Sequence, residues 1–288
     1  MMPNRSLNAL TILPIRGRVL LNFGKNVACW TGRGLGIWRL VNWGSYLFPS
    51  WRNCPVKGPD GKPFWIDLRG TGFGHIVSGF GIDEIESHIQ KLPKEAVALD
   101  IGANIGIWTR LLSGYLSNGM VYGFEPSPST FKKLQKNCSV SENIQCICAA
   151  LGNSSGKVKF KETCEPGLRH LIKGNSADGI FVETKTLAGW TTEARLDRVD
   201  FIKIDVEGWE ADVLIPAVSL LSRFRPIVCF EFIPAFAKAR SDYEGRQLFK
   251  LFDDLNYEVF RLDKSGGVQK DFTANYDWTN DYLARPMK

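Results

Sequence analysis

The sequence contains no long apolar run. None of its segments approaches the roughly 20 uninterrupted apolar residues that a membrane span needs, and the nearest one, Gly34–Phe48, is interrupted by polar residues such as Arg39 and Asn42. The first residues contain Pro14 and Arg16 where a secretory signal needs a clean apolar segment. We therefore expect neither a membrane span nor a signal peptide.

Cysteine pairs and histidines are also scarce. The seven cysteines are odd in number and include no Cys-x-x-Cys pair, which fits a reducing compartment better than a disulfide scaffold. Cys146 and Cys148 share a face if their segment is a strand, but without a nearby histidine two buried thiols are favoured over a metal site. Of the three histidines, only His170 lies in a polar segment that could cover a site, so it is either a candidate general base or a surface residue. We expect a cytoplasmic protein.

Acidic residues are nearly absent from the N-terminal segment. Residues 1–60 carry eight lysines and arginines against Asp60 alone, and they also contain four tryptophans, in a chain whose net charge is +6. Such a segment can contact an anionic membrane or nucleic acid, or it can be an irregular lid whose tryptophans pack on the main domain. We expect residues 1–92 to form this lid, with a β-hairpin at about Pro55–Asp67 and a helix at Asp83–Gln90. Peripheral membrane contact stays open, nucleic acid is disfavoured, and the sequence does not indicate the oligomeric state.

From Pro93 on, apolar strands alternate with helices. The expected strands are Ala96–Ile101, Met120–Glu125, Ile144–Leu151, "VDFIKID", "PIVCFEF", "YEVFRL" and a short last one at Tyr282–Ala284, and the expected helices are Ile107–Leu116, Ser129–Cys138, Trp209–Leu221 and Tyr243–Leu255. Residues 152–192 break this alternation and are expected to form an excursion beside the sheet. The pattern predicts an α/β domain over residues 93–288, whose doubly wound, mostly parallel sheet is covered by helices on both faces.

Ligands of such sheets bind at the carboxyl ends of the strands, where this sequence places "DIGANIG". A dinucleotide fingerprint needs glycines where Asn104 and Ile107 stand. Glu125 ends the next strand, where an acid can bind both ribose hydroxyls. Asp100 would repel a pyrophosphate but attract an ammonium and a sulfonium. These features favour S-adenosylmethionine as the cofactor, although both acids could instead bond nearby helix amides.

Four segments together resemble the FkbM-type family of S-adenosylmethionine-dependent methyltransferases. They are "ALDIGANIG", "VYGFEPSP", "LDRVDFIKIDVEGWEADVL" and "RPIVCFEF", and the likeness covers roughly Pro93–Phe232. The resemblance implies a class I methyltransferase (Rossmann-like) fold, in which the last of seven strands runs antiparallel. It also implies O-methylation of a hydroxyl on a sugar, a glycan or a small-molecule natural product.

The resemblance assigns roles to individual residues. It gives the methionine part of the methyl donor to Asp100, Gly102, Asn104 and Gly106, the ribose to Glu125, and the reaction centre to Asp205 and Glu207. From the strand end at Ala149–Leu151 we take Ala150 as a further cofactor-binding candidate.

Methyl transfer to a hydroxyl requires alignment and a group that accepts the proton. Asp205 ends the fourth strand, and Glu207 and Glu210 begin the next helix, where acids can also simply stabilise the helix dipole. Lys203 lies on the opposite face from its apolar neighbours and needs a partner, which is either a carboxylate or solvent. Asp205, Glu207 and Glu231 could hold a divalent cation, but their spacing is not diagnostic, so no metal is predicted.

The sequence departs from the family pattern at two positions. Ala188 stands where an acid is common, and Pro216 should kink or interrupt its helix. A short-chain dehydrogenase is disfavoured because no Tyr-x-x-x-Lys pair occurs. An RNA ribose O-methyltransferase and a non-catalytic methyltransferase-like binding protein remain as alternatives.

Overall fold

The computed structural model describes residues 53–67, 83–162, 170–172, 179–262, 268–270 and 280–287. Contacts divide the chain into one compact unit that includes residues 53–67 and a larger one that includes the other described residues. Most of the lid expected from residues 1–92 lies outside the described residues. The division at residue 92 and the lid itself therefore stay predictions.

The smaller unit contains the expected β-hairpin. Strand β1 (Cys54–Lys57) pairs antiparallel with β2 (Pro63–Ile66), with Cys54 opposite Ile66. Gly58 donates its amide to the carbonyl of Lys62 at 2.8 Å, and Gly61 has a φ of +82° that suits glycine in the turn. The Pro-Asp-Gly turn signal is confirmed.

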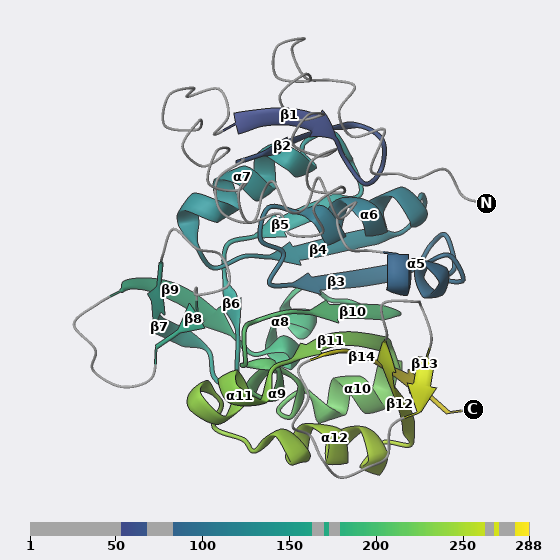
Figure 1. The fold of residues 1–288 in the computed structure, drawn as a ribbon, viewed down its shortest axis with the longest axis vertical. Coiled ribbons are helices and arrows are strands. Elements are labelled where there is room, and N and C mark those ends of the chain that lie inside the picture. The colour runs from purple at the N-terminus through teal and green to yellow at the C-terminus, as the bar shows by residue number, and fades with distance from the viewer. Residues whose placement is uncertain are drawn as a thin grey trace, which may run out of the picture. The chain divides into compact units, whose positions relative to one another are not determined.

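The larger unit is organised around one eight-stranded sheet (Figure 1). From one edge to the other its strands are β13 (Val268–Lys270), β12 (Tyr257–Leu262), β14 (Asn280–Pro286), β11 (Ile227–Phe232), β10 (Phe201–Ile204), β3 (Val97–Ile101), β4 (Met120–Phe124) and β5 (Ile144–Ile147). The five strands from β11 to β5 are parallel, and β14 runs antiparallel to β11 and β12. The expected sheet with an antiparallel last strand is confirmed, and the short β13 extends its edge.

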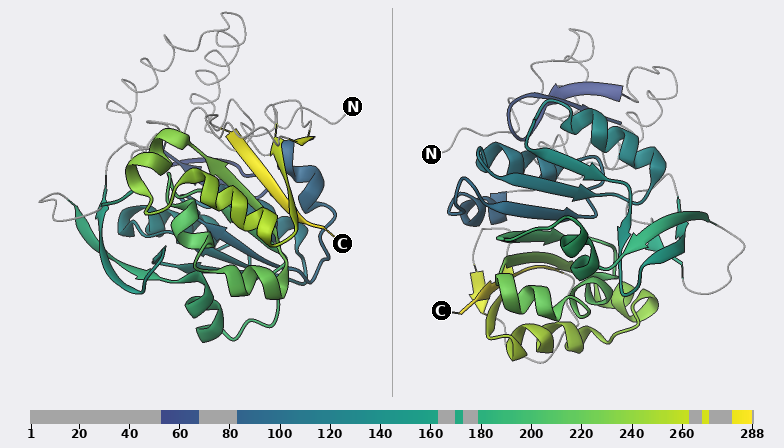
Figure 2. Two further views of the ribbon diagram at one scale, coloured as in Figure 1. Left: turned by 90° about the horizontal axis from the view of Figure 1, so that it is seen from below. Right: turned by 180° about the vertical axis from the view of Figure 1, so that it is seen from behind.

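A second sheet of four strands contains the excursion. In order its strands are β6 (Ala150–Leu151), β9 (Ile180–Lys185), β7 (Gly156–Lys161) and β8 (His170–Leu171). The strand expected over Ile144–Leu151 was wrong, because β5 ends at Ile147 and Ala150 begins β6. The second sheet lies at the end of the large sheet toward which the arrowheads of β3 and β4 point (Figure 1), as the view from behind also shows (Figure 2).

Eight described helices surround the large sheet. They are α5 (Asp83–Ile89), α6 (Ile107–Tyr115), α7 (Pro128–Cys138), α8 (Leu187–Glu193), α9 (Glu210–Leu214), α10 (Val218–Phe224), α11 (Pro234–Arg240) and α12 (Gly245–Asp254). Ser127 caps α7 by accepting the amide hydrogen of Thr130, and Pro128 occupies the first turn. The helix expected over Trp209–Leu221 is two helices, which separate at Pro216 as its missing amide requires. In the described part of the chain, none of the helices is both apolar and long enough to cross a membrane.

The alternation of side chains along β3 and β10 explains why helices cover both faces. Leu99 and Ile202 belong to a core that also includes residues of α8, α9, α10 and α12. Asp100 and Lys203, one position on, contact α6 on the other face, through Thr109 and Trp108 respectively. The doubly wound arrangement is therefore confirmed.

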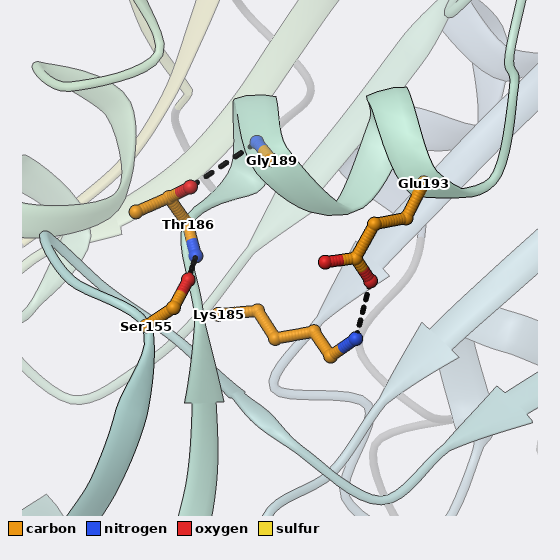
Figure 3. A network of polar contacts seen from close by, with 5 residues as sticks. All are labelled: Ser155, Lys185, Thr186, Gly189 and Glu193. Atoms are coloured by element: carbon orange, nitrogen blue, oxygen red, sulfur yellow. Dashed lines mark hydrogen bonds and ion pairs between the residues drawn. The ribbon is translucent and has the colours of Figure 1, made fainter.

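Helix α8 is connected to the second sheet by a small polar network (Figure 3). The Thr186 hydroxyl accepts the amide hydrogen of Gly189 at 3.1 Å, and the amide of Thr186 donates to the Ser155 hydroxyl at 3.3 Å. Lys185, the last residue of β9, pairs with Glu193 at 2.5 Å. These contacts join the excursion to the helix that precedes β10.

Candidate active site

The glycine loop between β3 and α6 approaches the end of β10 closely. Gly102, Asn104 and Gly106 all have positive φ angles, of +84°, +49° and +93°. A Cβ atom on Gly102 would lie 1.9 Å from the carbonyl oxygen of Asp205. Only glycine fits there, because both the φ angle and the contact exclude a side chain. The structure thus brings the predicted donor loop and the predicted reaction centre together.

Asp100 is buried beneath this loop, with 2% of its surface exposed. Its Oδ2 accepts a hydrogen bond from the Thr109 hydroxyl at 2.5 Å, and Gly123 on the adjacent strand leaves room for Thr109. Burial raises the pKa of Asp100 to about 6, although Thr109 and Lys203 act in the opposite direction. The carboxylate is therefore mostly ionised at neutral pH. It bonds the first turn of α6, as the structural alternative expected, and its contact with a methyl donor stays a prediction.

Glu125 connects the loops that follow β3 and β4. One carboxylate oxygen accepts the amide hydrogen of Asn104 at 3.1 Å, and the other accepts that of Ser127 at 2.9 Å. Because a carboxylate oxygen can accept more than one hydrogen bond, these contacts are compatible with a ribose hydroxyl as a further partner. Ribose binding by Glu125 stays a prediction.

The second sheet contacts both the start of α7 and the segment that follows β10. Glu162, directly after β7, accepts a hydrogen bond from the Ser129 hydroxyl at 2.6 Å, near the start of α7. Ala150 and Trp209 belong to one small core of this sheet, and Trp209 follows the loop after β10. Ala150 therefore lies beside the reaction-centre loop, and its role in cofactor binding stays a prediction. His170 lies in β8, opposite Lys161, and its role as a base stays a prediction as well.

Lys203 and Asp205 form a pair at the end of β10. The Lys203 side chain is 4% exposed and its ammonium lies 3.6 Å from Oδ2 of Asp205, whose side chain is 41% exposed. Burial by itself lowers the pKa of Lys203, but the surrounding acids, Asp205 first, raise it more, so that the net shift is upward. The partner that the sequence required for Lys203 is thus a carboxylate, and the lysine stays charged at neutral pH.

Glu207 lies in a strained turn after Asp205. Glu207 and Gly208 both have positive φ angles, of +56° and +98°, and a Cβ on Gly208 would meet the backbone of Phe236 at 2.7 Å. Arg240 of α11 donates to the carbonyl oxygen of Glu207 at 2.6 Å and stacks on the ring of Phe236. Burial and the nearby Asp205 raise the pKa of Glu207 to about 8, against the effect of Arg240. Backbone strain and a raised pKa are both typical of functional residues.

Glu210 hydrogen-bonds the backbone of the same turn. It is 2% exposed, and its Oε1 accepts the amide hydrogens of Val206 at 3.0 Å and Gly208 at 3.2 Å. Burial raises its pKa to about 7, although these amides act in the opposite direction. Glu210 therefore supports the helix terminus, the structural alternative that the sequence left open.

Two further acids complete an acidic cluster, which we define as Asp205, Glu207, Glu231 and Asp281. Glu231 of β11 lies directly opposite Asp281 of β14. Burial raises the pKa of Glu231 to about 8, with Asp205 adding to the effect and Lys203 opposing it, and burial also raises the pKa of Asp281. Sequence reasoning missed Asp281, although it immediately precedes the last expected strand.

The described residues contain no group of three histidine, cysteine, aspartate or glutamate side chains that could hold a metal ion. The arrangement of Asp205, Glu207 and Glu231 thus gives no support to the cation site that the sequence left open. The expected pair of buried thiols was also wrong. Cys148 is exposed, and Cys146 is half-buried and hydrogen-bonded to Cys138.

Comparison with known proteins places this geometry in context. A family model described as "Methyltransferase FkbM domain" matches residues 100–259. A 2-O-methyltransferase, NoeI, from Sinorhizobium fredii is 26% identical over 178 residues, which cover 56% of this chain and 71% of that protein. A hexuronic acid methyltransferase, AglP, from Haloferax volcanii is 27% identical over 135 residues, which cover 46% of this chain and 54% of that protein.

A crystal structure of the methyltransferase FkbM from Methylobacillus flagellatus is 14% identical and superimposes with a TM-score of 0.44. The match covers 74% of this chain and 53% of that one. The chain therefore spans just over half the length of that structure and of AglP.

Proposed function

The chain belongs to the FkbM methyltransferase family, and we propose that it transfers a methyl group from S-adenosylmethionine to a hydroxyl group of a sugar or glycan. One observation carries the choice of methyl donor, namely the two aspartates where β3 and β10 end. Asp100 is buried in β3 and Asp205 directly follows β10, and both lie near the single ammonium of Lys203. A pyrophosphate would be repelled there, whereas a sulfonium with an ammonium tail is attracted.

The residues around the glycine loop fit this methyl donor. Gly102 lets the loop approach the backbone of Asp205 closely, and Asp100 and Glu125 lie at the ends of the adjacent strands β3 and β4. We assign the methionine part to Asp100, Gly102, Asn104 and Gly106, the ribose to Glu125, and a neighbouring contact to Ala150. When bound, S-adenosylmethionine supplies an activated methyl group on a positively charged sulfur.

The acidic cluster offers carboxylates that can accept the proton of an acceptor hydroxyl. Asp205 has a side chain that is 41% exposed and a backbone carbonyl that the loop approaches at Gly102, and we assign to it the proton that the hydroxyl loses, with Glu207 as the second catalytic residue. A well-placed general base contributes typically 10²- to 10⁴-fold to the rate. Carboxylates also hydrogen-bond sugar hydroxyls readily.

Two further observations concern the acceptor. The relatives NoeI and AglP are named for 2-O-methylation and for hexuronic acid. The second sheet is attached through Ser129 and through Trp209, which follows the reaction-centre loop. We propose that this sheet contributes acceptor contacts.

Calorimetric titration tests the choice of methyl donor. S-adenosylhomocysteine should bind the full chain and raise its melting temperature, and NAD should do neither, because its pyrophosphate meets the carboxylates. Asp205→Asn should bind S-adenosylhomocysteine within threefold of the wild type. Heat and stabilisation from NAD, with none from S-adenosylhomocysteine, would refute the proposal.

A further inference from the structure

A buried ammonium group lies directly beneath the acidic cluster. In the large sheet Lys203 is the register partner of Asp100 on β3 and of Cys229 on β11. Asp205 and Glu231 lie two residues further along the same strands, on the same face and nearer to the strand ends. The ring of Trp108 on α6 covers the ammonium at 5.7 Å from its centroid.

The position of Lys203 suits a fixed counter-charge. Among the described residues, the Lys203 ammonium also contacts the Asp205 carboxylate at 3.6 Å and the carbonyl of Ile204 at 3.4 Å. The titratable groups that face it from the neighbouring elements are Asp100 of β3, Asp205 and Glu207 after β10, Cys229 and Glu231 of β11, and Asp281 of β14. A buried lysine without acidic partners would lose its proton. The positive charge of Lys203 therefore depends on the surrounding acids.

Asp205 is the member of the acidic cluster that forms an ion pair with this ammonium in the described part of the chain. The negative charge of Asp205 in turn helps to raise the pKa of Glu207, Glu231 and Asp281. Its own side chain is partly exposed and makes no hydrogen bond that would fix it among the described residues other than the contact with Lys203. Without the ammonium, the carboxylate would be free to rotate.

We propose that Lys203 is a positioning residue for methyl transfer, whose buried ammonium holds the Asp205 carboxylate in place toward the acceptor hydroxyl. The proposal rests on the proposed function, because it takes Asp205 to be the proton acceptor. Lys203 itself touches neither the methyl donor nor the acceptor in this account. It acts only through Asp205.

Carbon-13 NMR of the aspartate carboxyl groups tests the ion pair and needs no acceptor. In the full chain, Lys203→Met should shift the carboxyl resonance of Asp205, because it removes the ammonium that lies 3.6 Å from that carboxylate, and Lys203→Arg should leave the resonance nearly unchanged. Lys185→Met is the matched control, since it removes an ion-paired lysine that is bound to Glu193 instead. If Lys203→Met does not fold, Lys203→Gln replaces it. An unchanged Asp205 resonance in a folded variant would overturn the proposal.

Rates of methyl transfer test the functional part, with labelled S-adenosylmethionine and a sugar glycoside that the wild type methylates. Lys203→Met should lower kcat about 100-fold, as expected when a base is misplaced, with S-adenosylhomocysteine affinity kept within threefold. In the Asp205→Asn background it should cause no further loss. An additive loss would overturn the positioning role alone, whereas full activity of Asp205→Asn would overturn the proposed function and this role with it.

Discussion

Gly102→Ala should separate the donor loop from the reaction centre. The new Cβ would lie 1.9 Å from the carbonyl oxygen of Asp205, and the residue would keep a φ of +84°. A left-handed backbone costs a residue with a side chain roughly 1–2 kcal/mol, and an overpacked contact costs typically 1–3 kcal/mol. Because the clash is with backbone, the strands must move apart. We expect the free energy of unfolding to fall by about 2–5 kcal/mol.

Urea denaturation and calorimetry with S-adenosylhomocysteine measure the two consequences. The affinity should fall at least tenfold, since the loop that cradles the methyl donor is displaced. Gly156→Ala is the matched control, because Gly156 also has a positive φ, of +148°, but no atom lies within 4 Å of its added Cβ. If Gly102→Ala binds S-adenosylhomocysteine like the wild type and unfolds like Gly156→Ala, the close approach does not shape the site.

Three other predictions concern the acids and their partners. Asp205→Asn should keep donor binding and lose at least 100-fold in kcat, and full turnover would remove Asp205 from the mechanism. Because the pKa of Glu207 is about 8, the rate should rise with pH up to about 8, and this rise should disappear in Glu207→Gln but persist in the control Glu183→Gln, which changes an exposed acid of β9. Because the pKa of Glu207 is higher in the folded than in the unfolded chain, its contribution to the free energy of unfolding is largest below the unfolded pKa and is lost as the pH rises through about 8. The free energy of unfolding, measured with urea, should therefore depend less on pH in Glu207→Gln. Arg240→Ala removes a positive charge that lowers the pKa of Glu207, so its pH–rate profile should lie at higher pH than that of the wild type. The profile of Arg240→Lys should lie between the two. A profile of Arg240→Ala that coincides with that of the wild type would mean that Arg240 does not affect Glu207.

Most strands of the large sheet could be predicted from sequence because they are apolar and alternate with helices. The interruption at Pro216 was also predictable, since proline cannot donate the helix hydrogen bond. The division of Ile144–Leu151 was not, because both β5 and β6 are apolar and only the pairing of Ala150 with Thr184 separates them. Periodicity does not report which strand is the partner.

The candidate site was predicted where a residue ends a recognisable strand. Asp100, Glu125 and Asp205 do so, and the structure places them at one edge of the sheet. Asp281 and Arg240 were missed because they act across strands and helices that are distant in sequence. For α11, a signal was present in Pro234 at its first turn and basic residues in its last turn. Nothing in the sequence indicates that Arg240 reaches the Glu207 carbonyl.

The most direct test of the account is to find where the methyl group goes. S-adenosylmethionine with a carbon-13 methyl group would be incubated with the full chain and a panel of hexose, deoxyhexose and hexuronic acid glycosides, with an RNA sample in parallel. NMR of the products distinguishes methyl on oxygen, nitrogen and carbon. The account predicts an O-methyl sugar whose formation is lost in Asp205→Asn. Label on RNA, label on nitrogen or carbon, or binding of S-adenosylhomocysteine without any transfer would contradict it.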